Sequence, residues 1–157
     1  MSRVRKSAAA AALAVTVIGG AEGLRQSAYP DPATRGNPWT ICYGHTGGVK
    51  PGERASMEEC KALLIADMDK EGDAIEKCVP SLATAPVERY VASLSLSHNI
   101  GSGGFCRSSI ASDLNAGRIR EACDAFLRYN RAAGFVMPGL TARRKKEREL
   151  CMVDLPQ

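Results

Sequence analysis

The chain has 157 residues, of which 45% are hydrophobic and 24% charged, as in a globular protein with a single domain and a core of its own. Its formal net charge of +4 suits an anionic partner such as a cell-wall polymer, a nucleic acid or a membrane surface. Only 5% of the residues are aromatic, which argues against a stacking platform for single-stranded nucleic acid.

The first predicted element is an alanine-rich helix that follows basic residues. Arg3, Arg5 and Lys6 precede an uncharged stretch, residues 7–21, which is the layout of an export signal. Because a membrane span needs about 20 strongly apolar residues, insertion of this short, alanine-rich stretch into a bilayer is expected to be marginal and reversible. Alanine is also the best helix former in water, so the stretch is expected to be helical in either solvent.

A small antiparallel sheet is predicted next, within residues 28–50. Turn residues lie on both sides of the run Trp39–Tyr43, which is β-branched and aromatic.

Helices are predicted for the rest of the chain. Ser56 and Glu59 fit a capping box that begins a helix, and this helix is expected to end at Val79-Pro80. Four further helices are predicted at residues 87–99, 106–115, 119–129 and, after Pro138-Gly139, up to residue 151, with a glycine-rich break at residues 101–104. The expected fold is α+β and helix-rich, with two lobes and a natural ligand site in the cleft between them.

The six cysteines predict disulfide bonds. None of them forms a C-x-x-C pair, and the chain has only two histidines, so the sequence offers few of the ligands that a zinc site needs. An even number of cysteines behind an export-like segment indicates an oxidising compartment, whereas six free thiols in a cytosolic protein are the alternative. Many pairings are possible, and the spacing alone does not choose among them.

Glu22, Asp31 and Thr40 are the candidate catalytic residues. Glycoside hydrolysis needs one protonated and one ionised carboxyl group. Glu22 ends an apolar helix, where partial desolvation favours the protonated form, whereas Asp31 lies in a proline-rich turn and is expected to stay ionised. The Thr40 hydroxyl can hold a water molecule. By spacing alone, however, two ordinary surface charges would look the same.

The residues around these three resemble the active-site region of phage-type lysozymes, glycoside hydrolase family 24. The similarity is carried by residues 22–25, 28–31, 39–46, 99–105 and 138–144, and it covers nearly the whole chain. Thr40 follows Asp31 after a longer turn than the family pattern has, with the extra residues at 33–38.

The resemblance implies a lysozyme-like enzyme that hydrolyses the β-1,4 bond between N-acetylmuramic acid and N-acetylglucosamine with inversion. Glu22 is then the general acid, Asp31 the general base or charge stabiliser, and Thr40 helps to hold the nucleophilic water. Inversion requires the two carboxyl groups to lie about 6.5–9.5 Å apart. The expected partner is peptidoglycan, with no metal, cofactor or nucleic acid, and the protein is expected to be a monomer.

The resemblance also gives the first 21 residues a function. Residues 1–21 resemble the signal-arrest-release segment of lambdoid endolysins, and residues 22–157 are the catalytic domain. The enzyme is then tethered to the inner membrane in an inactive form before it acts in the periplasm. The segment contains no cysteine, so release by thiol exchange within it is not expected. The alternative is an export signal that is cut off.

Other residues acquire expectations from the same resemblance. His45 is expected to form a structural ion pair with Asp67, and Arg143 is expected to approach Glu22. Independently of the resemblance, His98 is expected to be a helix residue with no special role. The implied disulfides are Cys42–Cys60, Cys78–Cys106 and Cys123–Cys151.

Three alternatives remain open from the sequence. The basic run at residues 143–148 is typical of a solvated helix face but could also attract an anionic wall. The fold could serve a non-catalytic peptidoglycan-binding module or a membrane-anchored structural protein, although the anchor is poorly built for the latter. A muramidase could serve phage lysis or local opening of the wall by its host.

Overall fold

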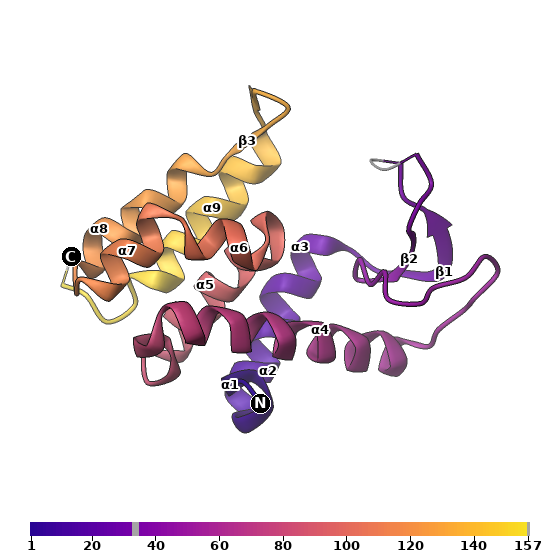
Figure 1. Cartoon of the computed structure of the whole chain (residues 1–157), viewed down its shortest axis with the longest axis horizontal. Coiled ribbons are helices and arrows are strands. Elements are labelled where there is room, and N and C mark those ends of the chain that lie inside the picture. The colour runs from indigo at the N-terminus through magenta and orange to yellow at the C-terminus, as the bar shows by residue number, and fades with distance from the viewer. Residues whose placement is uncertain (33–34, 157) are drawn as a thin grey trace.

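The computed structural model describes residues 1–32 and 35–156, and it has the expected two lobes (Figure 1). A small sheet lies at one end, a helical body lies at the other, and the long helix α4 runs along both. The N-terminal segment consists of α1 (Arg3–Lys6), α2 (Ala8–Ala14), the π-helical turn η1 (Val15–Gly19) and α3 (Gly20–Glu22). It is followed by β1 (Arg25–Pro30), β2 (Trp39–Cys42) and α4 (Met57–Cys78). The body contains η3 (Pro80–Ala83), α5 (Val87–Ile100), α6 (Ser102–Cys106), α7 (Ser109–Asn115), α8 (Ile119–Ala125), η4 (Phe126–Arg128), β3 (Arg131–Ala132), β4 (Phe135–Val136) and α9 (Pro138–Cys151).

Helix α4 begins and ends where its sequence predicts. The Ser56 side chain accepts a hydrogen bond from the Glu59 backbone at 3.1 Å, and the Glu59 carboxylate accepts one from the Ser56 backbone at 2.7 Å. These two bonds complete the predicted capping box. The helix ends two residues before Pro80, whose ring cannot continue it.

The sheet is antiparallel and short. Tyr29 pairs with Thr40 and Pro30 pairs with Trp39, with an irregularity in the register between Arg25 and Tyr29. The sheet begins at Arg25, three residues earlier than predicted. The turn between the strands contains residues 33 and 34, where the sequence places part of its insertion, and these two residues lie outside the described ones.

Two predictions for the helical body are wrong. The glycine-rich stretch breaks the chain only at Gly101, where φ is +82°, and the next five residues form α6. The helix predicted at 106–115 is α7, which ends at Asn115 as predicted but begins three residues later, at Ser109, because Ser108 caps it by accepting a hydrogen bond from the Ala111 backbone at 3.2 Å. The hairpin of β3 and β4 was not predicted, and its turn, Ala133-Gly134, has positive φ at both residues.

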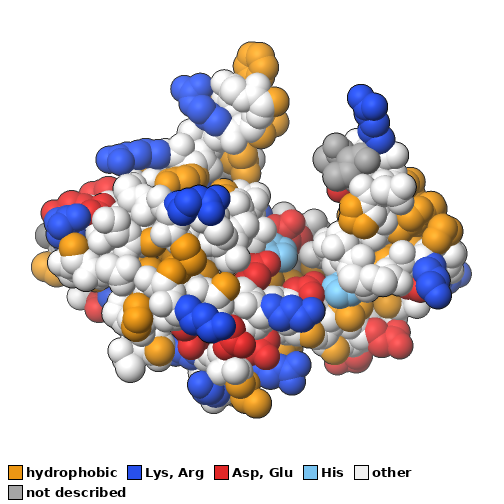
Figure 2. All heavy atoms as spheres, viewed as in Figure 1, with side chains coloured by type: hydrophobic (Ala, Val, Ile, Leu, Met, Phe, Trp, Pro, Cys, Tyr) orange, Lys and Arg blue, Asp and Glu red, His pale blue; other side chains and the backbone are white. Residues whose placement is uncertain are grey.

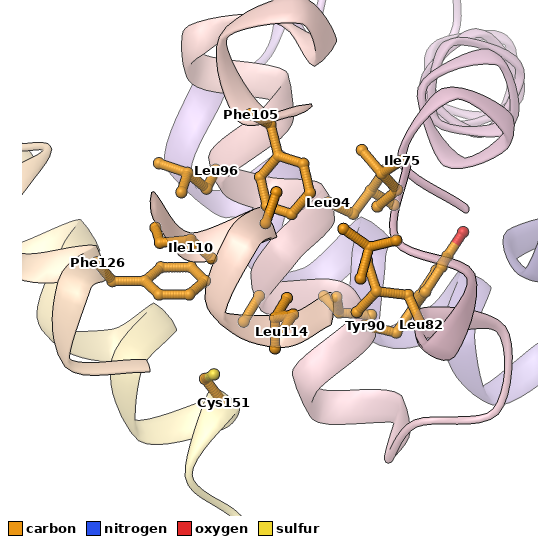
Figure 3. Close-up of a cluster of buried hydrophobic side chains, with 14 of the residues drawn as sticks. Ile75, Leu82, Tyr90, Leu94, Leu96, Phe105, Ile110, Leu114, Phe126 and Cys151 are labelled. Atoms are coloured by element: carbon orange, nitrogen blue, oxygen red, sulfur yellow. The ribbon is translucent and has the colours of Figure 1, made fainter. Parts of the chain in front are cut away.

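Helix α5 lies at the centre of the hydrophobic core (Figure 3). Its residues from Arg89 to Ser97 are all buried, and neighbouring helices contribute large side chains around Tyr90, Leu94 and Leu96. Figure 3 shows Phe105, Ile110, Leu114 and Phe126 gathered against this helix.

All three implied disulfides are present. Cys42–Cys60 joins β2 to α4, with the Cα atoms 5.0 Å apart. Cys78–Cys106 joins α4 to α6, and Cys123–Cys151 joins α8 to α9. One disulfide therefore links the sheet to α4, and the other two link pairs of helices.

The N-terminal segment is packed into the same core. Val4, Ala10, Ala14 and Ile18 are buried at spacings of four to six residues, so one face of the segment meets the helical body. Among the described residues, no helix combines the length and hydropathy that crossing a bilayer requires. The division of the chain at residues 21 and 22 stays a prediction.

Candidate active site

Glu22 lies where the helical body passes into the sheet lobe. It is the last residue of α3, and Gly23 ends that helix with a φ of +75°, a conformation that favours glycine. The Gly23 backbone still donates a hydrogen bond to the Gly19 carbonyl at 3.2 Å. The carboxyl group is therefore carried by a helix end that is anchored on one side by the core and continues directly into β1.

Arg143 forms an ion pair with Glu22. Its Nη1 atom donates to Oε1 of Glu22 at 2.7 Å, and a quarter of the Glu22 side chain stays exposed. Arg143 is itself held by the Ser95 carbonyl oxygen at 3.1 Å and by Glu147 at 3.2 Å. The approach of Arg143 to Glu22, which the resemblance implies, is confirmed.

A buried charge cluster supports Arg143 from α9. The Glu147 and Arg144 side chains are 1% and 0% exposed, and their Oε2 and Nε atoms lie 2.7 Å apart. Burial raises the pKa of Glu147. The charges of Arg144 and Arg143 and a hydrogen bond from Ser95 act in the opposite direction but do not outweigh burial. Burial also lowers the pKa of Arg144. The expectation that this run forms a solvated helix face is thus wrong for Arg144 and Glu147, because they point into the body.

His98 was expected to have no special role, but it lies next to Glu22. Its Nε2 atom is 4.0 Å from Oε1 of Glu22, and its Nδ1 atom donates to Oε1 of Glu71 at 2.9 Å. One signal in the sequence pointed to Glu71: it follows Asp67 by four residues and so shares a helix face with it. Nothing comparable marked His98, whose neighbours come from other elements.

Thr40 lies on β2 of the sheet lobe, and Asp31 lies just after the end of the neighbouring strand, β1. Asp31 directly follows Pro30, which pairs with Trp39, and Thr40 is the next residue of β2. The Gly36 backbone donates to the Asp31 carbonyl at 2.8 Å, which closes the turn after β1. Thr40 is 5% exposed, and its hydroxyl has no hydrogen-bond partner among the described residues. The structure therefore brings Asp31 and Thr40 to one end of the sheet.

His45 and Asp67 form the expected ion pair. The ring Nδ1 atom donates to Oδ2 of Asp67 at 2.8 Å, and Nε2 lies 3.1 Å from the Gly47 carbonyl oxygen. The pair ties the loop after β2 to α4, on the wall of the cleft that belongs to the sheet lobe.

The surface between the lobes is hollowed, and histidine and acidic side chains gather at its floor (Figure 2). A cavity of about 320 Å³ is lined there by His45, Asp67, Glu71 and His98. A larger cavity of about 1090 Å³ is lined by α5, α9 and the end of the N-terminal segment, and it includes Arg143. Arg143 and Ala21 line the larger cavity and His98 lines the smaller one, so Glu22 has a neighbour in each. In the described part of the chain, no three His, Cys, Asp or Glu side chains are grouped so that they could hold a metal ion.

Comparison with known proteins agrees with this architecture. Residues 19–147 match the family model described as phage lysozyme. This chain belongs to the phage lysozyme family. The enzyme is 34% identical to the SAR-endolysin of Enterobacteria phage P21 over 145 residues, which cover 92% of this chain and 87% of the relative.

Two solved structures resemble the whole enzyme. P22 lysozyme, solved as a mutant, is 33% identical with a TM-score of 0.77, and the match covers 89% of this chain and 95% of that one. The muramidase domain of SpmX from Asticaccaulis excentricus is 31% identical with a TM-score of 0.75, and the match covers 93% and 96%. The predicted fold class and the predicted lysozyme activity are both confirmed: the enzyme is a glycoside hydrolase that acts on peptidoglycan.

Proposed function

We propose that Glu22 is the general acid of an inverting muramidase that cleaves the β-1,4 bond between N-acetylmuramic acid and N-acetylglucosamine. The observation that supports this assignment is that Arg143 holds the Glu22 carboxyl group and that Arg143 and His98, the two neighbours of this group, each line a cavity. A fixed carboxyl group beside an extended groove is what proton delivery to a bridging oxygen requires.

In the proposed reaction, Glu22 gives its proton to the glycosidic oxygen as the bond from that oxygen to the anomeric carbon breaks. A water molecule attacks the anomeric carbon from the opposite face, and Asp31 accepts a proton from this water. The buried hydroxyl of Thr40, which has no described partner, helps to hold the water. The sugar is released with inverted configuration, and both carboxyl groups return to their starting states after one proton exchange with solvent.

The test compares wild type with Glu22→Gln in clearing of purified peptidoglycan, with analysis of the sugar products. A general acid contributes about 10²–10⁴-fold to the rate, so a loss of at least that size is expected. Glu58→Gln removes the same charge from an 86% exposed side chain and should keep wild-type activity. Both variants should unfold like wild type. Full activity of Glu22→Gln would remove Glu22 from the mechanism.

We further propose that the enzyme is a monomer made as a tethered endolysin and that residues 1–21 stay attached. The relative from phage P21 is named a SAR-endolysin, and in this chain the corresponding segment fills part of the core. A weakly apolar helix that finds buried neighbours in the folded enzyme can leave the inner membrane for the periplasm. Cleavage after Ala21 would instead leave Glu22 on a frayed end.

The mass of the active periplasmic enzyme tests the retained segment. The expected product contains residues 1–21, and an active product that begins at Glu22 would contradict the release proposal. Holin or spanin genes beside the coding sequence would support a role in phage lysis rather than in local opening of the wall by the host.

A further inference from the structure

A second titratable pair lies beside Glu22 and has no part in the reaction described above. His98, near the end of α5, is 15% exposed and lies between two carboxyl groups. Glu71 of α4 is on its Nδ1 side at 2.9 Å, and Glu22 of α3 is on its Nε2 side at 4.0 Å. One imidazole therefore connects three helices at the floor of the cleft.

The chemistry of the imidazole ring favours the cation in this position. A neutral ring has one N–H and one lone pair, so one of the two carboxylates would face a lone pair, whereas the cation offers an N–H to each. Burial alone lowers the pKa of His98. The hydrogen bond to Glu71 and the charges of Glu71 and Glu22 outweigh burial, and Arg143 opposes them, so the pKa of His98 is raised.

The surroundings hold the ring in place. Oε1 of Glu71 accepts from the ring, while its Oε2 is buried and has no hydrogen-bond partner among the described residues. The same cavity is lined by His45, Asp67 and Lys70, the other titratable groups that face this floor. His45 and Asp67 form an ion pair with each other, so the carboxylates directed at His98 are those of Glu71 and Glu22.

We propose that the His98 cation, held by Glu71, is a positioning residue that fixes the Glu22 carboxyl group opposite Arg143. The proposal rests on the proposed role of Glu22 as the acid. Arg143 at 2.7 Å and His98 at 4.0 Å then hold the same Oε1 atom from α9 and α5.

Two consequences follow for activity. The ring can hold the Glu22 carboxylate only while it is a cation, so in wild type this contribution should be lost as the pH rises through the raised pKa of His98. Without His98, that part of the alkaline limb of the pH–activity profile should be absent. The carboxyl group is also held less firmly, so kcat at the optimum should fall by roughly 3- to 10-fold with little change in KM.

The first experiment records initial rates of peptidoglycan clearing against pH for wild type, His98→Asn and Glu71→Gln. Both variants should lose that part of the alkaline limb, and the double variant should resemble either single one, because the two residues act as one unit. Glu58→Gln, on the same helix as Glu71, should keep the wild-type profile. A lower unfolding midpoint with an unchanged profile would mean that His98 only packs, and it would overturn the proposal.

The second experiment does not depend on activity. The chain has two histidines, so NMR of the full enzyme shows two ring titrations, and His98→Asn identifies which of them belongs to His98. In wild type His98 should titrate above an ordinary histidine, and it should titrate lower in both Glu71→Gln and Glu22→Gln. An unchanged titration of His98 in Glu22→Gln would overturn the coupling. Activity retained by Glu22→Gln would instead overturn the proposed function, so the two failures are distinguishable.

Discussion

Two neighbouring alanines in α2 provide a direct test of whether the N-terminal segment belongs to the folded enzyme. Ala10 is 0% exposed and packs in the core, whereas Ala9 lies on the solvent face of the same helix. Leucine at either position adds the same apolar side chain at nearly the same depth in a membrane. The two substitutions therefore strengthen the tether equally and differ only in the folded state.

The expected difference follows from packing. Forcing three extra carbon atoms into the closed site around Ala10 costs about 1–3 kcal/mol, which lowers the ratio of folded to unfolded enzyme by about 5- to 150-fold. At the exposed Ala9 the change in unfolding free energy should stay within about 0.5 kcal/mol. Ala10→Leu should therefore increase the share of membrane-bound enzyme for two reasons: it strengthens the tether, and it destabilises the competing folded state.

The assay has two parts. Urea unfolding of the purified enzymes gives the difference in stability, and fractionation of expressing cells gives the share of enzyme in the membrane and the periplasm. We expect Ala10→Leu to be less stable and more strongly retained in the membrane than Ala9→Leu, which in turn is retained more than wild type. Equal stability and equal release of the two variants would show that α2 is not packed in the released enzyme.

Three further predictions concern stability. Replacing both Cys78 and Cys106 by serine opens a loop with a sequence separation of 28 and should lower the unfolding free energy by about 3.5 kcal/mol; an unchanged urea midpoint would refute this. Gly72→Ala should destabilise the enzyme despite a gain of about 1 kcal/mol in helix propensity, because the new Cβ would lie 2.6 Å from a side-chain atom of the N-terminal segment. A higher thermal midpoint for this variant would contradict this prediction and would show that the N-terminal segment shifts to make room for the new Cβ. Because the pKa of His98 is raised in the folded enzyme, protonation of His98 stabilises the fold. This stabilisation is fully present below the unfolded-state pKa and is lost as the pH rises through the folded-state pKa. His98→Asn should therefore give a flatter plot of unfolding free energy against pH in that window.

Local signals explain which elements could be predicted. The start of α4 follows from a capping box four residues long, and the start of α9 follows from Pro138 at its first position. Both signals act between residues that are close in the chain, so no tertiary contact is needed to read them. Helix α6 was not predicted because it depends on tertiary packing. Glycines 103 and 104 are poor helix formers, and the packing of Phe105 into the core outweighs their low propensity.

The candidate site shows the same division. The positions of Glu22, Asp31 and Thr40 relative to the helix end and the strands could be predicted, because they follow from short-range order and from resemblance. The partners of Glu22 come from elsewhere: Arg143 is 121 residues away, and Glu71 reaches the site only through His98. Periodicity does not carry such information, since it shows which face of a helix is apolar but not which helix lies opposite.

The sequence by itself determined that this chain is helix-rich, with a glutamate at the end of a weakly apolar helix, because composition and caps are properties of neighbouring residues; that it is a lysozyme followed from its resemblance to phage-type lysozymes. Only the tertiary structure decided that this helix is part of the core, that Arg144 and Glu147 are buried, and that His98 lies against Glu22. Burial and proximity arise from how separate helices pack, and packing depends on all of their side chains together.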